Sequence, residues 1–218
     1  MPRTARVVVP GLPHHVTQRG NRRMRTFFCA EDYARYRTVM SESCVRYGVE
    51  IWAYCLMPNH GHLVAVPESP EALREAIGEA HKKYTREINK REGWRGHLWQ
   101  GRFASYPMDE RHTIAAAKYI ELNPVRAGLV SSAAEHEWSS ARAHLFGCDD
   151  ELVRVAPLLA RVEDWGRFVG QAIEPEMLDA LRRHMASGLP LGDEAFLKEV
   201  EERVGRVVAP REAVCAVA

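Results

Sequence analysis

Short stretches in which hydrophobic and polar residues alternate recur in the first half of the chain and predict β-strands. Residues 14–18 (HHVTQ) lie between glycine- and proline-containing turns and predict the first strand. Residues 49–56 and 60–66 are rich in β-branched and aromatic side chains, and the turn-forming residues 57–59 (MPN) separate them. Two antiparallel strands joined by a short loop are therefore expected there. A fourth strand is expected at residues 98–103 (LWQGRF).

Two longer segments repeat their apolar residues at three- and four-residue steps, which is the spacing of one helix face. The first covers residues 31–47, and Gly48 stands where such a helix would end. The second has Ser69 as its expected N-cap and Pro70 as its first residue, and its apolar face continues to Ile88.

A third helix is expected over residues 113–123, with Thr113 as its cap. Pro124 should break or kink this helix, because proline lacks an N–H and restricts the residue before it. The resulting order, β-α-β-β-α-β-α, is typical of a split βαβ arrangement. We therefore predict an α+β fold with a ferredoxin-like antiparallel sheet and helices packed on one face.

The last third of the chain shows no strand pattern and predicts a small helical extension. Residues 175–186 and 193–204 each have helical spacing, and a glycine that can end the helix follows each of them. We therefore divide the chain into residues 1–150 and a helical C-terminal extension, residues 151–218.

The chain of 218 residues is nearly neutral overall, but its charges are separated along the sequence. Residues 1–126 contain 20 basic and 13 acidic residues, whereas residues 127–218 contain 10 and 16. The basic part indicates a polyanionic partner such as nucleic acid. The arginines that precede the first acidic residue are Arg3, Arg6, Arg19, Arg22, Arg23 and Arg25.

The cysteines and the apolar runs exclude several classes of protein. The five cysteines are scattered and never form a C-x-x-C pair, so neither a disulfide framework nor a thiolate zinc site is expected. No stretch approaches the roughly 20 apolar residues of a membrane span, and the short run of residues 7–9 is no signal-peptide core. We expect a cytoplasmic protein without a membrane partner.

Two pairs of residues could carry chemistry. His60 and His62 stand two apart on an expected strand, so they project to the same side and can present two imidazoles to one ion. This spacing is also consistent with two partly buried, hydrogen-bonded histidines. Tyr119 and Asn123 stand four apart on an expected helix and share a face, although a tyrosine at helical spacing is more commonly a core residue. Core positions are assigned to Tyr33, Tyr36, Tyr47 and Tyr84.

Five segments, in this order and spacing, resemble the REP-associated tyrosine transposases, bacterial relatives of the single-tyrosine HUH transposases of insertion sequences. The resemblance covers roughly residues 7–147, and the five blocks together are more specific than any one motif. The segments are HHVTQRGNRR (14–23), YCLMPNHGHLVAV (54–66), LWQGRFASYPMD (98–109), KYIELNPVRAGLV (118–130) and EWSSARAHL (137–145). The extension also resembles the one that many members carry.

The resemblance implies a role for each of four residues. His60 and His62 match the metal-binding histidine pair of the family, and Asn123 matches its third ligand. Tyr119 matches the nucleophilic tyrosine. The activity implied is cleavage and rejoining of single-stranded DNA near palindromic hairpins, through a covalent 5′-phosphotyrosine intermediate and with Mg²⁺ or Mn²⁺. The implied partner is single-stranded DNA with a hairpin, and a monomer is favoured over a homodimer.

The DNA contacts are predicted from charge and aromatic character. Arginine forks and backbone N–H groups suit phosphates, and aromatic rings suit unstacked bases. Solvated helix faces carry similar charge, which leaves the helical lysines open to a purely structural interpretation. The predicted contacts are Arg19, Asn21, Arg22, Arg23, Arg25, Lys82, Lys83, Arg86, Trp99 and Arg102, with Tyr106 as a further base contact. Trp52 and Trp138 are assigned to packing.

Two other functions stay open at this point. The first is a noncatalytic protein that binds DNA hairpins through the basic part of the chain. The second is a metal-dependent hydrolase of nucleic acid that uses water as its nucleophile, for which Tyr119 would be dispensable. The acidic charge of the extension disfavours direct contact with a DNA backbone, although helix termini could still engage phosphates.

Overall fold

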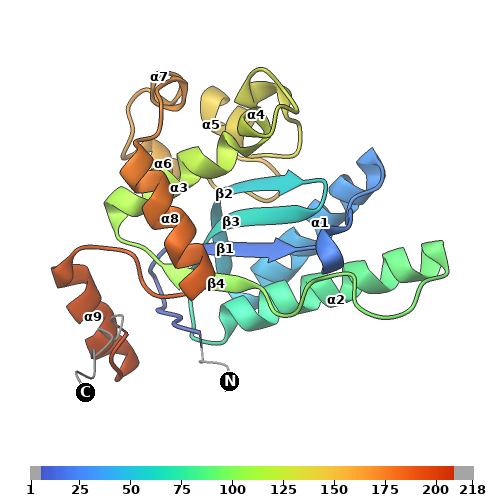
Figure 1. Ribbon diagram of the computed structural model, residues 1–218, viewed down its shortest axis with the longest axis horizontal. Helices are drawn as coiled ribbons and strands as arrows, with labels where there is room; N and C mark the ends of the chain where they lie inside the picture. Colours follow the sequence, from blue (N-terminus) through green and yellow to red (C-terminus); the bar gives the residue numbers. More distant parts are fainter. Residues whose placement is uncertain (1–5, 209–218) are drawn as a thin grey trace, which may run out of the picture.

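A four-stranded antiparallel sheet in the order β2-β3-β1-β4 forms the centre of the molecule (Figure 1). The computed structural model describes residues 6–208, so Arg3 and Cys215 lie outside the described part. The strands are β1 (His14–Arg19), β2 (Val49–Met57), β3 (His60–Pro67) and β4 (Ala104–Pro107). The predicted α+β class and the first three strands are confirmed.

The fourth strand is not where the sequence pattern placed it. Residues 98–103 form only an isolated bridge between Trp99 and Gly20, and β4 follows at residues 104–107. Gly101 has a φ of 63°, in the left-handed region, so the chain turns there and continuous strand pairing is interrupted.

One face of the sheet is covered by α1 (Ala30–Tyr47) and α2 (Ala72–Glu92), which pack Tyr36, Leu73 and Ile77 into an apolar core. Gly48 ends α1 in the left-handed conformation, as predicted. The prediction of Ser69 as the N-cap of α2 is wrong. The helix begins at Ala72, because Pro70 and Glu71 form a turn first and the Ser69 carbonyl accepts the Ala72 N–H.

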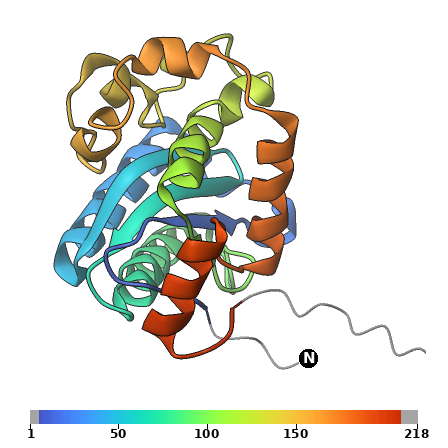
Figure 2. The same ribbon diagram turned by 90° about the vertical axis from the view of Figure 1, so that its left-hand side faces the viewer.

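The other face carries α3 (Glu110–Glu121), so the expectation that helices pack on one face holds only for α1 and α2 (Figure 2). Asp109, not Thr113, caps α3, because its carboxylate accepts the His112 N–H at 2.8 Å. The break before Pro124 is confirmed, since α3 ends and α4 (Asn123–Arg126) begins on either side of Leu122.

The two predicted helices of the C-terminal extension are confirmed as α8 (Pro175–Ser187) and α9 (Glu194–Val204). Much of the C-terminal extension, α8 included, packs on the α3 side of the sheet, whereas α9 packs against residues 7–9. Leu181 of α8 lies in the same apolar core as Ile120 of α3, so the core crosses the predicted division at residue 150. The other helical segments are η1 (Asn21–Arg23), η2 (Ala133–Glu135), α5 (Ala141–Phe146), α6 (Ala156–Leu159) and α7 (Trp165–Gly170).

Two expectations about the whole chain can be compared with the described part. Among residues 6–208 no helix is long and apolar enough to cross a bilayer. The cysteines in this part of the chain are all free thiols, namely Cys29, Cys44, Cys55 and Cys148.

Candidate active site

The four residues that the resemblance singled out line a single cavity of about 650 Å³ on the α3 side of the sheet. His60 and His62 project from the same face of β3, because residues two apart on a strand point to the same side. Their ring centroids are 5.1 Å apart, and the His62 centroid is 6.0 Å from that of Tyr119. Tyr119 comes from α3, and Asn123 begins α4. We call this cavity the site cavity.

Each of the two histidines uses one ring nitrogen within the protein. The Nδ1 atom of His60 lies 2.6 Å from Oδ1 of Asn59. Because the Asn59 amide nitrogen donates to the Arg23 carbonyl at 3.0 Å, its oxygen is the group that faces His60 and accepts. The Nδ1 atom of His62 lies 3.0 Å from Nε2 of His15. Within residues 6–208 neither Nε2 atom of the pair has a hydrogen bond.

Burial keeps both rings neutral. Burial, and after it the positive charge of Arg19, lowers the pKa of His60 to about 4. Burial also lowers the pKa of His62 well below its ordinary value, with the neighbouring His15 as the next cause. A neutral imidazole is the state that can bind a metal ion.

Asn123 presents an amide nitrogen that is buried and has no hydrogen-bond partner among residues 6–208. Native proteins pair nearly all buried polar atoms, so such an orphan points to a missing ligand. A rotation of the amide by 180° puts its oxygen in the same place. Two imidazole nitrogens and one amide oxygen suit Mn²⁺ well and Mg²⁺ acceptably. Among the described residues, no three His, Cys, Asp or Glu side chains form a cluster that could hold a metal ion.

Tyr119 is held by its surroundings on α3. Its ring is largely buried, and the Arg126 guanidinium lies 4.8 Å from the ring centroid in a cation–π contact. Arg126 was not among the predicted site residues, although it lies one turn beyond Leu122 in the KYIELNPVRAGLV segment.

Three arginines from separate parts of the fold line the site cavity. Arg19 ends β1, Arg102 lies in the loop before β4, and Arg182 comes from α8. Guanidinium groups are suited to binding phosphate oxygens. The net acidity of the extension had argued against a DNA contact there, so Arg182 was missed. Arg182 reaches the site cavity because α8 packs against β4 and α3, which the sequence alone does not show.

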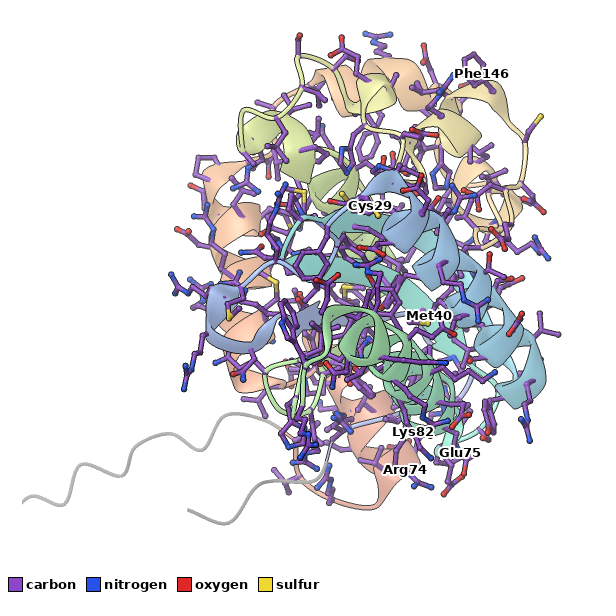
Figure 3. The ribbon with its side chains drawn as sticks, turned by 90° about the vertical axis from the view of Figure 1, so that its right-hand side faces the viewer. Cys29, Met40, Arg74, Glu75, Lys82 and Phe146 are labelled. Carbon is purple, nitrogen blue, oxygen red and sulfur yellow. The ribbon has the colours of Figure 1, made fainter. Side chains whose placement is uncertain are left out.

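A second cavity of about 660 Å³ lies between α2 and residues 97–103. We call it the basic groove, and its charged lining residues include Arg74, Lys82, Arg86 and Arg102. Arg102 also lines the site cavity, so the two cavities adjoin. Figure 3 shows Arg74 and Lys82 on the same stretch of α2. Lys83 lies outside the groove, with its ammonium 3.6 Å from Glu42 of α1.

The arginine turn that follows β1 lies next to the histidine pair. Asn21, Arg22, Arg23 and Arg25 are all exposed. Arg22 and Arg23 have φ angles of 53° and 61°, in the left-handed region that non-glycine residues rarely adopt. The turn is tied to the loop between β2 and β3, because the Gly20 N–H donates to the Asn59 carbonyl at 2.8 Å.

The two aromatic rings predicted to stack on bases are mostly buried. Trp99 is only 7% exposed and packs in the core beneath the basic groove, and Tyr106 is only 1% exposed. Stacking of a base on either ring stays a prediction, and Trp99 does line the basic groove. Trp94, which the sequence reasoning did not single out, is 41% exposed. Trp52 and Trp138 pack against the core, as predicted.

Known proteins resemble this chain in sequence. The family model described as "Transposase IS200 like" matches residues 9–123, slightly more than half of the chain. A protein of Haemophilus influenzae described as a REP-associated tyrosine transposase is 27% identical over 154 residues, which cover 65% of this chain and 81% of that protein.

A solved structure shares the fold. It is that of a REP-associated tyrosine transposase bound to a REP hairpin, with a TM-score of 0.58 and 21% sequence identity. The match covers 71% of this chain and 93% of that chain.

Proposed function

The chain belongs to the family of IS200-like transposases, and from this premise we propose that it cleaves and rejoins single-stranded DNA beside a hairpin. In this proposal Tyr119 is the nucleophile and forms a covalent link to a 5′ phosphate. The observation that carries it is the site cavity, where the Tyr119 ring lies beside two histidines whose Nε2 atoms have no hydrogen bond within residues 6–208.

The chemistry assigned to Tyr119 is a reversible phosphoryl transfer. Its phenol oxygen forms a bond to phosphorus as the bond from phosphorus to the 3′ oxygen breaks. The phenol loses its proton, and the departing oxygen takes one up to become a 3′ hydroxyl. The phosphodiester energy stays in the covalent adduct, so a DNA 3′ hydroxyl can reverse the step without ATP.

His60, His62 and Asn123 would hold a divalent ion, Mg²⁺ or Mn²⁺. When bound, such an ion orients the phosphate and neutralises charge that develops on its nonbridging oxygens. The arginines that line the cavity, Arg19 and Arg182, would bind the neighbouring phosphates and fix the strand in position.

We further propose that the basic groove binds DNA beside the cleavage point. The structurally similar transposase binds a REP hairpin, and a DNA hairpin is the substrate class that we assign to this chain. Lys82, Arg86 and Arg102 have no ion-pair partner among residues 6–208, so their charges are available to phosphates. The four proposed catalytic and metal-binding residues all come from one chain, which supports a monomer as the working unit.

The test is a search for the covalent adduct. Purified protein is incubated with Mn²⁺ and single-stranded oligonucleotides from the flanks of its own gene, and the products are separated on a denaturing gel. We expect a protein–DNA band that disappears with chelator and with Tyr119→Phe. Tyr84→Phe is the matched control, because its hydroxyl is bonded to the Thr26 carbonyl on the opposite face of the sheet.

The three functions left open by the sequence give different results in this test. A hydrolase that uses water would cleave the oligonucleotides equally well with Tyr119→Phe and would leave no adduct. A noncatalytic hairpin-binding protein would bind the oligonucleotides without cleaving them. Either outcome would overturn the proposal.

A further inference from the structure

A chain of hydrogen bonds leads from His62 through the interior of the protein to the C-terminal extension. Nδ1 of His62 lies 3.0 Å from Nε2 of His15, and Nδ1 of His15 lies 2.8 Å from the Tyr106 hydroxyl. The Tyr106 hydroxyl lies 3.3 Å from the main-chain carbonyl of Leu181 in α8. His15 and Tyr106 are both buried in the protein interior.

The Leu181 carbonyl, at the end of this series of hydrogen bonds, determines which atom donates in each of them. A carbonyl oxygen can only accept, so the Tyr106 O–H donates to Leu181. The Tyr106 oxygen then accepts the N–H of His15 Nδ1. A neutral imidazole carries a single N–H, so Nε2 of His15 is an acceptor and takes the proton of His62 Nδ1. The lone pair of His62 is left on Nε2.

If each hydrogen bond ran in the opposite direction, the bond to Leu181 would be lost and His62 could not bind a metal ion. If Nε2 of His15 donated to His62, its Nδ1 would have to accept the Tyr106 hydroxyl proton. No proton would then be left for the Leu181 carbonyl. The Nε2 atom of His62 would also carry a hydrogen and could not bind an ion. The geometry therefore favours a single arrangement of protons.

We propose that His15 and Tyr106 are positioning residues that hold His62 in the tautomer protonated on Nδ1, with the Leu181 carbonyl of α8 as the anchor. This inference rests on the proposed function, because it assigns the Nε2 atom of His62 to a metal ion. Outer partners of this kind fix the orientation and tautomer of metal-binding histidines. The extension is thereby part of the machinery that prepares the site.

Tyr106→Phe is the sharpest test, because it removes one buried hydroxyl and keeps the ring. The first readout is nitrogen NMR of the His62 ring in metal-free protein, in which protonated and unprotonated ring nitrogens have well-separated shifts. We expect the wild type to carry its proton on Nδ1 alone and Tyr106→Phe to show a mixture of tautomers. The second readout is Mn²⁺ affinity, which we expect to fall roughly 10-fold or more.

Tyr36→Phe is the matched control. The Tyr36 hydroxyl also pairs with a histidine, lying 3.0 Å from Nε2 of His81, but on the opposite face of the sheet. It should lose a comparable hydrogen bond and leave both the His62 tautomer and Mn²⁺ affinity unchanged. Equal effects of the two substitutions would show a general loss of stability and overturn the proposal.

A pair of substitutions at His15 tests the same inference independently. His15→Gln keeps a side-chain oxygen that can accept from His62 Nδ1, whereas His15→Leu removes the acceptor. We expect His15→Gln to retain more Mn²⁺ affinity than His15→Leu. Equal affinities, or a wild-type His62 protonated on Nε2, would overturn the proposal.

The tautomer measurement uses neither DNA nor metal, so its outcome is separate from that of the proposed function. If Tyr119 forms no adduct while the Tyr106→Phe effects appear, the proposed transposition chemistry fails and the positioning role stands. If the adduct forms and Tyr106→Phe leaves the His62 tautomer unchanged, the proposed function stands and the positioning role fails.

Discussion

Two adjacent histidines on β1 point to opposite faces of the sheet and show how the faces differ. His14 and His15 are both fully buried, and burial lowers their pKa values to about 4 and about 3. Within the described part of the chain, both ring nitrogens of His14 bond to the main chain: Nδ1 donates to the Leu12 carbonyl at 2.8 Å and Nε2 accepts the Val9 N–H at 3.1 Å. His15 is bonded to two side chains instead.

The difference shows that burial alone does not distinguish a structural histidine from a functional one. On the α1 and α2 face, the hydrogen bonds of His14 are complete and end within the local backbone. On the α3 face, the hydrogen bonds of His15 lead to His62, whose remaining nitrogen has no partner among residues 6–208. A buried polar group becomes a candidate for function when its network ends at an unsatisfied atom in a cavity.

The largest expected effect comes from the histidines of the α3 face. His60→Ala or His62→Ala should reduce adduct formation by roughly 10²–10³-fold, because a metal ion contributes several kcal/mol at about 1.4 kcal/mol per tenfold. Binding of the uncleaved oligonucleotide should be retained, since the basic groove is untouched. Adduct yield and oligonucleotide affinity are measured on the same preparations, and wild-type yields in either variant would contradict the assignment.

The α1 and α2 face should respond to pH through His14. Its pKa is lower in the folded protein than in the unfolded chain, so the unfolded state binds the extra proton as pH falls below about 6.5. The stability is present above that pH and is lost towards the folded pKa of about 4. At pH 5 the loss is about 2 kcal/mol for this histidine.

His14→Gln should flatten the pH dependence by that amount. The measurement is the free energy of unfolding of both proteins by denaturant at pH 7 and pH 5. The difference between the two pH values should be smaller in the variant, because the amide does not titrate. Parallel curves for the wild type and the variant would contradict the structural role given to His14.

The smallest expected effect is that of the basic groove, which acts through charge alone. Lys82→Ala and Arg86→Ala should each reduce the slope of log affinity against log salt concentration by about 1. The matched control is Lys83→Ala, because Lys83 pairs with Glu42 outside the groove. A control that alters the slope as much as the groove variants would show that only net charge matters.

The sequence was sufficient for most of the sheet and for the helices with clear apolar spacing. It misplaced β4, because the left-handed Gly101 interrupts a stretch with a strand-like composition. It also chose Thr113 as the cap of α3, although the Asp109 side chain caps the helix by accepting the His112 N–H. Such choices depend on backbone geometry that residue types leave undetermined.

The site itself was predictable only in part. His60, His62, Tyr119 and Asn123 could be proposed because they lie in recognisable segments, and the structure places them around one cavity. The role of His15 could not be seen, because its partners are 47 and 91 residues away in sequence. Only strand pairing brings them together. The boundary at residue 150 and the catalytic roles stay predictions.

The most direct test of the central claim is to locate the covalent bond. Protein incubated with a labelled oligonucleotide and Mn²⁺ is digested with trypsin, and the peptide that carries nucleotide is identified by mass spectrometry. The account predicts a 5′-phosphate linkage on the peptide of residues 119–126, at Tyr119. A nucleotide on any other peptide, or cleavage without a linked peptide, would contradict it.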